Sequence, residues 1–346
     1  MRENKDYAIT IPIGNAIKGI AVLMMVFHHC YGFPGWIDDA TRIPTCMNQL
    51  QGWALSAKFC VAIFAFLTGW TYFHHLDKSC AYSLKKIASC LVEYGVLVAA
   101  MVALASLFCG YEPSLSGCVK ELFPLGCFHK LMGFAWYIRF YLIVLLLLPF
   151  LAILQDTQGK VYRLVVLVFG LFALYASLVI SGHGEDAYWL PCVISGYACA
   201  QYKVIERCVG CMMLLKIGLV IGVVAVVASC YLYRYFGYVL LGRFNAGALY
   251  APFFCCGWII LYPYVQKIKI AGFLQILGKH SLNIWLLHGI FFSIPTRTSF
   301  QRFAYAVDSP FYVLPFVVGV CLIASMLIKP LQKVCLRIIV EKMAGF

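Results

Sequence analysis

The sequence predicts an all-α, polytopic integral membrane protein, a helical bundle with about ten transmembrane helices. Its 346 residues are 63% hydrophobic and only 12% charged, whereas soluble domains carry about 25% charged residues. The apolar residues form long runs rather than alternating segments of about ten residues, which favours helices over a membrane β-barrel. No connecting segment is long enough for a soluble module, so we expect one membrane-embedded domain over residues 1–346.

Ten apolar segments are candidate spans. The first carries Lys18, His28 and His29 and lacks a small-residue cleavage pattern, which favours a span over a signal peptide. Only the short hinge 181–186 separates the fifth segment from the sixth. The predicted spans are 11–33, 53–75, 87–109, 134–154, 163–182, 187–203, 211–233, 246–266, 281–299 and 310–330.

Lys and Arg residues are divided unevenly between the two sides of the predicted membrane. Of the 27, 17 lie near the span ends on the side of both termini, and the net charge is +13. The positive-inside rule therefore predicts a multi-pass protein of the cell (plasma or inner) membrane with both termini cytoplasmic. The charge reflects this topology and contact with the lipid bilayer, so no nucleic-acid partner is expected. The 7 on the opposite side are Arg42, Lys120, Lys130, Arg234, Arg243, Arg297 and Arg302.

The 17 cysteines do not predict a metal centre. Most lie inside predicted spans, where a thiol behaves as a small apolar group. Cys46, Cys118 and Cys127 fall in predicted external loops and could pair in an oxidising compartment, in any combination. Cys208 and Cys211 form a single CxxC pair without a second ligand pair, so no metal site is expected.

A cation and an imidazole share one face of the first predicted span. His29 follows Lys18 by eleven residues, which on an α-helix returns to within about 20° of the same direction, roughly 16 Å further along. His28 points about 80° away from that line. Ionisable side chains inside a membrane are costly and usually functional, and an imidazole is the usual general base for a hydroxyl. The alternative is that both side chains simply extend to the membrane surfaces.

Two further groups of residues are candidates for substrate binding. In the ninth span Ser281 and His288 are seven residues apart and share a helix face. The alternatives there are a helix cap at Ser281 and a packing role for His288. Trp136, Tyr137 and Arg139 open the fourth span, where Arg139 suits either an external anionic ligand or anchoring at the membrane interface.

Charged residues also mark the third span. Lys85 and Lys86 lie at its cytoplasmic start and suit an anionic ligand arriving from inside, although the positive-inside rule alone also explains them. Lys58 and Glu93 lie within spans and could pair with each other or with the site. The stretch 110–133 contains apolar residues around Lys120 and Glu121 and could form a short interfacial helix over the external face.

Four stretches, in this order, resemble the acyltransferase-3 family of membrane acyltransferases: 15–29, 64–70, 136–149 and 278–288. The resemblance covers essentially the whole chain. Members of the family typically have about ten spans and move acetyl or other acyl groups onto cell-surface glycans and related acceptors. The resemblance therefore implies an enzyme that uses acetyl-CoA or another acyl-CoA as co-substrate and binds no permanent cofactor.

The resemblance also implies roles for single residues. The family's first span has a basic residue, usually Arg, eleven residues before its catalytic His, and Lys18 and His29 occupy these positions. Its third span begins with two Arg three residues apart that are associated with acyl-CoA. Lys86 matches the first, but Ser89 stands at the second. Lys keeps the charge without the bidentate grip of Arg on phosphate, so Lys85 or another residue replaces the second cation, or the donor differs.

Two classes of function follow. In the first, the chain is a membrane O-acyltransferase in which Lys18, Lys85 and Lys86 hold the donor and His29 is the general base for a hydroxyl of a glycan or lipid-linked saccharide. The residues expected to line the acceptor side are Trp136, Tyr137, Arg139, Ser281 and His288. In the second, the chain is a transporter or flippase of such a saccharide without acyl-transfer chemistry. The lack of an inverted repeat disfavours the second class. Loss of catalysis is disfavoured because His29 is kept.

Overall fold

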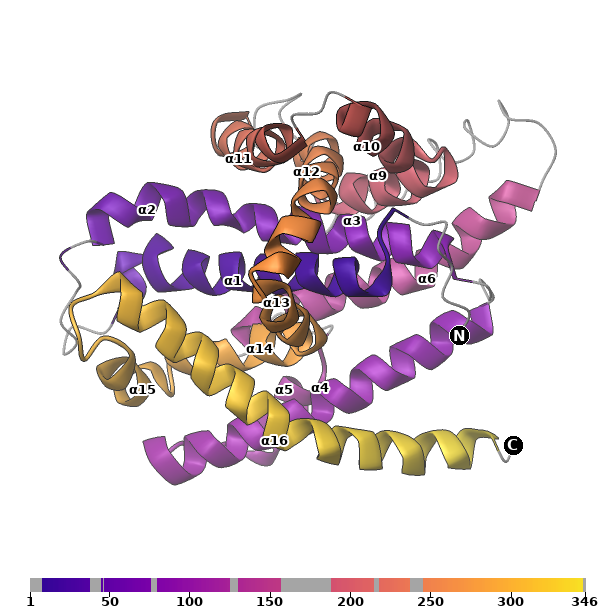
Figure 1. Cartoon of the computed structure of the whole chain (residues 1–346). Coiled ribbons are helices and arrows are strands. Elements are labelled where there is room, and N and C mark those ends of the chain that lie inside the picture. Colours follow the sequence, from indigo (N-terminus) through magenta and orange to yellow (C-terminus); the bar gives the residue numbers. More distant parts are fainter. Residues whose placement is uncertain are drawn as a thin grey trace. The chain divides into compact units, whose positions relative to one another are not determined.

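The computed structural model describes residues 8–37, 45, 47–75, 80–124, 130–156, 188–214, 218–236 and 245–344. Every regular element in these ranges is a helix, which confirms the predicted all-α class (Figure 1). The chain divides into two compact units. Unit 1 comprises Met1–Met24, Ser56–Ser83 and Ile143–Lys279, and unit 2 comprises Met25–Leu55, Leu84–Leu142 and His280–Phe346.

Six helical segments of the described chain are long and apolar enough to cross a membrane. This finding supports a membrane protein, but it does not confirm the predicted count of about ten spans. The fifth predicted span, 163–182, lies outside the described residues. The six segments are Ile11–Gly32, Met47–Phe73, Cys80–Cys109, Leu219–Phe236, Gly247–Lys267 and Phe311–Ile339.

Several predicted spans correspond closely to helices. The first, third and eighth are α1 (Ile11–Gly32), α4 (Cys80–Cys109) and α12 (Gly247–Lys267). The second is built from two helices, α2 (Met47–Ser56) and α3 (Cys60–Phe73), joined by the 3₁₀ turn η2 (Ala57–Phe59). The fourth consists of the turn η3 (Gly133–Ala135) and α6 (Trp136–Asp156), and the sixth is the short α9 (Leu190–Gln201).

The predicted bounds of the seventh, ninth and tenth spans were wrong. The seventh begins later, because α10 (Val204–Leu214) ends before α11 (Gly218–Phe236) starts. The ninth is broken: α14 (Ser281–Leu287) passes at His288 into the turn η4 (His288–Phe291), and α15 (Arg297–Ala304) follows. The tenth extends through α16 (Pro310–Ala344), and the helix bends about midway in Figure 1. Pro315 and Pro330 lie inside this helix, and proline bends a helix because it removes a hydrogen bond and clashes with the preceding turn.

Unit 1 contains two helix crossings that only glycine allows. At the crossing of α3 with α9, a Cβ on Gly69 would collide with the carbonyl oxygen of Val193, and a Cβ on Gly196 would collide with that of Phe66. The two backbones therefore approach as closely as van der Waals radii permit. The same unit places α12 against α9, α10 and α11 (Figure 1).

The second crossing joins α1 to α13 (Ile270–Lys279). A Cβ on Gly19 would collide with the carbonyl oxygen of Leu274, and one on Gly278 with that of Asn15. Gly19 and Gly278 belong to two of the stretches that carry the family resemblance. Part of that resemblance therefore reflects helix packing rather than chemistry.

Unit 2 holds a buried polar contact between α14, α16 and α4. Asn283 and Gln332 exchange amide hydrogen bonds of 2.9 and 3.1 Å, and Gln332 Nε2 also donates to the backbone oxygen of Glu93 at 3.0 Å. One turn away, His280 Nδ1 lies 2.7 Å from Ser325 Oγ. Each of these groups is satisfied by a specific partner, so the contact fixes the register of α14 on α16.

The short helix expected within 110–133 is present as α5 (Leu115–Leu122). Ser114 caps it, because its Oγ accepts the Gly117 N–H at 3.1 Å. Among the three cysteines expected in external loops, Cys118 of α5 is a free thiol, and Cys46 and Cys127 lie outside the described residues.

Candidate active site

His29 of α1 and His288 of η4 form a hydrogen-bonded pair in unit 2. The Nδ1 of His29 lies 2.9 Å from the Nε2 of His288, and the two ring centroids are 4.8 Å apart. His288 is fully buried, whereas His29 is partly exposed. The sequence marks both residues as candidates, but it does not indicate that they meet, since they lie 259 residues apart.

The surroundings of His288 favour one direction for this hydrogen bond. The backbone carbonyls of Trp285 and Ile284 interact with the His288 ring, although its Nδ1 has no hydrogen bond of standard geometry to the described residues. A carbonyl oxygen can only accept, which agrees with a proton on Nδ1, the nitrogen of His288 that does not face His29. Nε2 of His288 is then the acceptor and His29 donates from Nδ1. The lone pair of His29 consequently resides on its Nε2.

Aromatic rings surround the histidine pair. The Phe134 centroid lies 4.6 Å from that of His29 and also 4.6 Å from that of His288. Phe292 lies 6.2 and 6.0 Å from the same two rings. Gly289 makes room for Phe134, because a Cβ there would approach its ring to 2.9 Å. These buried rings exclude water, which strengthens electrostatic interactions at the pair.

Two more rings lie beyond the C-terminal end of α1. Phe33 and Trp36, at the turn η1 (Pro34–Trp36), stack with centroids 4.2 Å apart. Trp36 is nearly parallel to the His29 ring, at 5.9 Å and 11°, and is 37% exposed. The sequence analysis did not select either residue. The available signal is that both aromatic residues follow His29 closely in the sequence.

His28 takes no part in this pair's hydrogen bond. Its Nδ1 donates to the carbonyl oxygen of Ala54, at 2.7 Å, and its side chain is buried. His28 thus ties α1 to α2, in agreement with the different direction that helical spacing predicts for it.

Two of the predicted acceptor residues of α6 pack on Trp285 of α14. Tyr137 stacks on Trp285 at 4.6 Å, and Trp136 meets the same indole edge-on at 6.3 Å. The Trp285 Nε1 donates to the backbone oxygen of Phe134 at 3.3 Å. Trp136 and Tyr137 therefore pack on the indole that is bonded to the Phe134 backbone, and these contacts do not involve His29.

The remaining predicted site residues are more peripheral. Arg139 is half-buried one turn into α6, and Ser281 is half-buried at the start of α14, two turns before His288. Lys18 is half-buried in the part of α1 that belongs to unit 1. Since α1 is unbroken from Ile11 to Gly32, the eleven-residue helical spacing between Lys18 and His29 is retained.

A buried carboxylate holds the segment that carries Phe134. Glu121 of α5 is only 3% exposed. It accepts the backbone N–H groups of three consecutive residues: Lys130 at 2.7 Å, Leu131 at 2.9 Å and Met132 at 3.0 Å. Ser293, just after η4, donates to the backbone oxygen of Leu131 at 2.6 Å. No sequence pattern predicts this role of Glu121, because its partners are backbone amides.

A group of charges lies where α4 meets α16. Lys85 and Lys86 are exposed in the second turn of α4. The Glu93 carboxylate, two turns after Lys86, interacts electrostatically with Lys329 of α16 and with Lys86. The Gln332 bond to the Glu93 backbone confirms that the two helices are adjacent here. Lys329 is thus a cation that acts on Glu93, and the sequence alone does not connect the two residues.

Comparison with protein families identifies one match. A model described as an acyltransferase domain, that of the acyltransferase-3 family, matches residues 15–329. The matched range contains both members of the histidine pair and every ring that contacts them. Comparisons with curated proteins and with solved structures gave no match.

Proposed function

The chain belongs to the acyltransferase-3 family, and on this basis we propose that it is a membrane-bound O-acyltransferase that moves an acetyl group from acetyl-CoA to a hydroxyl of a cell-surface glycan or lipid-linked saccharide. The hydrogen bond between His29 and His288 is the observation that carries the proposal. An imidazole held by a second group, with its other nitrogen directed to the reaction, is the usual arrangement of a general base.

The reaction follows from the tautomer assigned above. Nε2 of His29 takes the proton of the acceptor hydroxyl while the hydroxyl oxygen attacks the thioester carbonyl carbon. The tetrahedral intermediate collapses, the carbon–sulfur bond breaks, and the CoA thiolate leaves. The imidazolium of His29 returns the proton to that thiolate, which gives the acetyl ester, free CoA thiol and neutral His29.

His288 is a positioning residue in this scheme, not the acceptor ligand expected from the sequence. Its Nε2 accepts from His29 Nδ1 and so fixes both the ring orientation and the tautomer of the base. Being neutral, it stabilises an imidazolium less than a carboxylate would. The Trp285 and Ile284 carbonyls behind His288 add to this stabilisation by polarising its ring.

The charges of α4 and α16 suit the acyl-CoA donor. Lys86 and Lys329 both act on Glu93, so the two ammonium groups lie in one region. Lys329 would supply the cation that is missing at Ser89, and the exposed Lys85 would add a further charge at the rim. In the proposed topology, with both termini cytoplasmic, this region opens to the side where acetyl-CoA is found.

Acyl transfer with the purified, membrane-reconstituted protein tests the proposal. The full chain is incubated with radiolabelled acetyl-CoA and a cell-envelope polysaccharide fraction, and label in the polysaccharide is counted. We expect His29→Ala to reduce transfer at least about 100-fold, the usual contribution of a general base. His28→Ala is the matched control and keeps most of the activity, because His28 bonds to Ala54 instead. Transfer by His29→Ala at a near wild-type rate would refute the mechanism.

A further inference from the structure

Phe33 and Trp36 form a pair of stacked rings beside the proposed base, here called the aromatic platform. Their rings stack 17° from parallel, and Trp36 lies 11° from the plane of His29. Trp36 keeps 37% of its surface exposed, whereas Phe134 and Phe292, two other aromatic neighbours of His29, are buried. The platform is therefore the exposed part of the ring cluster around His29.

Among the described residues, the space beside Gly35 of the platform turn is unfilled. Gly35, between the two turn residues Pro34 and Trp36, is exposed, and a Cβ built there would meet no atom within 4 Å. No described side chain therefore occupies the space next to Gly35, the residue that precedes Trp36. The exposed surface is a single indole at a tight turn, which suits a compact ring better than a long acyl chain.

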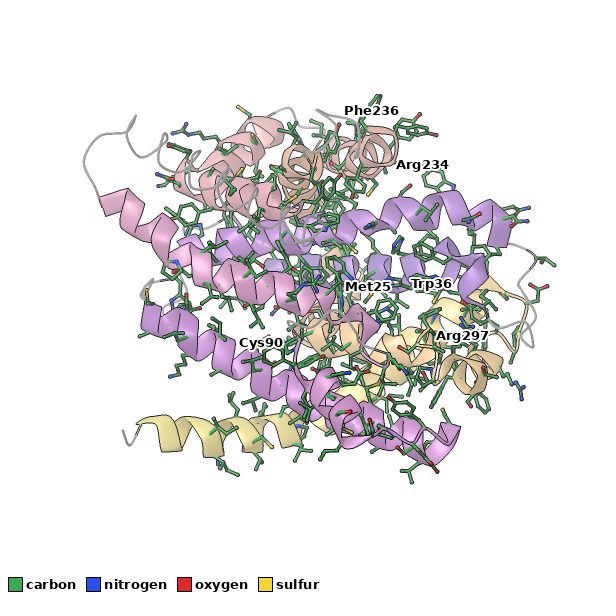
Figure 2. All side chains as sticks on the ribbon, turned by 180° about the vertical axis from the view of Figure 1, so that it is seen from behind. Met25, Trp36, Cys90, Arg234, Phe236 and Arg297 are labelled. Atoms are coloured by element: carbon green, nitrogen blue, oxygen red, sulfur yellow. The ribbon has the colours of Figure 1, made fainter. Side chains whose placement is uncertain are left out.

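Hydrogen bonds from α15 and Tyr305 also fix the backbone at and just before the platform. Gln301 of α15, fully buried, donates from Nε2 to the backbone oxygen of Trp36 at 2.9 Å. Tyr305 donates to the backbone oxygen of Cys30, near the end of α1, at 2.8 Å. Figure 2 labels Trp36 and Arg297, the first residue of α15, in the same region of unit 2. A preorganised ring loses little entropy when it binds a ligand.

We infer that the aromatic platform is the acceptor subsite, and that it binds the C–H face of a pyranose ring whose hydroxyl then reaches His29. This inference rests on the proposed acyl transfer at His29. The C–H groups of one sugar face are weakly positive and apolar, so they suit the electron-rich face of an indole. Stacking removes that face from water while the hydroxyls at the ring edge stay available for reaction.

The test compares sugar acceptors with an acceptor that cannot stack. The reconstituted full chain receives labelled acetyl-CoA and either a set of methyl pyranosides or glycerol, and kcat/KM is measured for each. We expect Trp36→Ala to lower the pyranoside-to-glycerol ratio of kcat/KM about tenfold, mainly through a higher pyranoside KM. Trp36→Phe restores most of the ratio. Trp53→Ala is the matched control, since Trp53 is an exposed tryptophan of the same unit.

The outcomes separate this inference from the proposed function. An unchanged ratio in Trp36→Ala, with acyl transfer intact, would overturn the acceptor subsite and leave Trp36 as an interfacial anchor. An equal loss for pyranosides and glycerol would also overturn it, because the variant would then have damaged the base. Absence of any acetyl transfer by the wild-type protein, to every acceptor, would instead refute the acyltransferase proposal itself.

Discussion

A hydrogen bond of 2.9 Å joins the Nε2 of His288 to the Nδ1 of His29, and it connects the first helix of the described chain to a turn 259 residues later. The turn exists because α14 ends at Leu287 and the backbone continues as the 3₁₀ segment His288–Phe291. His288 is fully buried, so its bond to His29 is protected from competition by water. The proposed base is thus oriented from the interior of unit 2.

Replacing His288 by Gln or by Phe tests its positioning role. The amide oxygen of Gln can accept from His29 Nδ1, whereas Phe fills the space without an acceptor. We expect His288→Phe to lower kcat about 100-fold with little change in the KM for acetyl-CoA, and His288→Gln to recover at least about tenfold of that loss. Steady-state kinetics of both variants provides the measurement. Equal activity of the two variants would show that His288 only fills space.

Glu121 should affect the site through the segment 130–132. Glu121→Gln replaces charge-assisted bonds by neutral ones and turns an N–H donor toward at least one backbone N–H. We expect a destabilisation of about 2 kcal/mol, seen as a lower Tm in detergent, together with a reduced kcat because Phe134 loses its fixed position. Glu112→Gln, at an exposed carboxylate just before α5, is the control and should change neither quantity. A wild-type Tm and kcat in Glu121→Gln would contradict this role.

The sequence reveals those parts of the fold that depend on hydrophobicity and spacing along one helix. The apolar run of α1 and the spacing between Lys18 and His29 are local properties, and α1 forms where they predict it. The ninth span was predicted too long because an apolar run does not distinguish a continuous helix from one that turns at His288 and Gly289. Hydropathy measures the preference of side chains for an apolar phase over water, and it does not report the path of the backbone.

Contacts between distant segments could not be predicted in the same way. His29 and His288 were separate candidates, and nothing in either span specifies the other as its partner. Glu121 is harder still to predict from the sequence. Its partners are backbone N–H groups, which nearly every residue carries, so no residue pattern identifies them. Gly19 and Gly278 lie in stretches that carry the family resemblance, but their packing role appears only when they are seen against the backbone of the neighbouring helix.

The crossing of α3 with α9 gives a prediction about stability. Gly196→Ala adds a methyl group where the carbonyl oxygen of Phe66 already lies, so the helices must separate. We expect a loss of at least about 1–3 kcal/mol, measured as a lower Tm and a lower yield of folded protein. Gly210→Ala is the matched control, because a Cβ at that position of α10 meets nothing within 4 Å. It should be neutral or slightly stabilising, since alanine is the better helix former. Similar Tm values for the two variants would disprove the close crossing.

Lys329 gives the final prediction, which concerns the donor. If Lys86 and Lys329 together bind the phosphates of acetyl-CoA, removing either cation weakens ground-state binding without touching the base. We expect Lys86→Ala and Lys329→Ala each to raise the KM for acetyl-CoA about tenfold, with kcat nearly unchanged, which corresponds to about 1.4 kcal/mol. Lys333→Ala is the control, because Lys333 is an exposed lysine one turn further along α16.

Two properties of the measurement distinguish donor binding from a structural effect. Raising the salt concentration should increase the KM of the wild-type protein more than that of either variant, because an ionic contact is screened only where it exists. The double variant should also lose less than the product of the two single effects, since both lysines act on the same Glu93 carboxylate. If Lys329→Ala and Lys333→Ala gave the same small change, Lys329 would have no part in the donor site, and the cation missing at Ser89 would have to come from elsewhere on the chain.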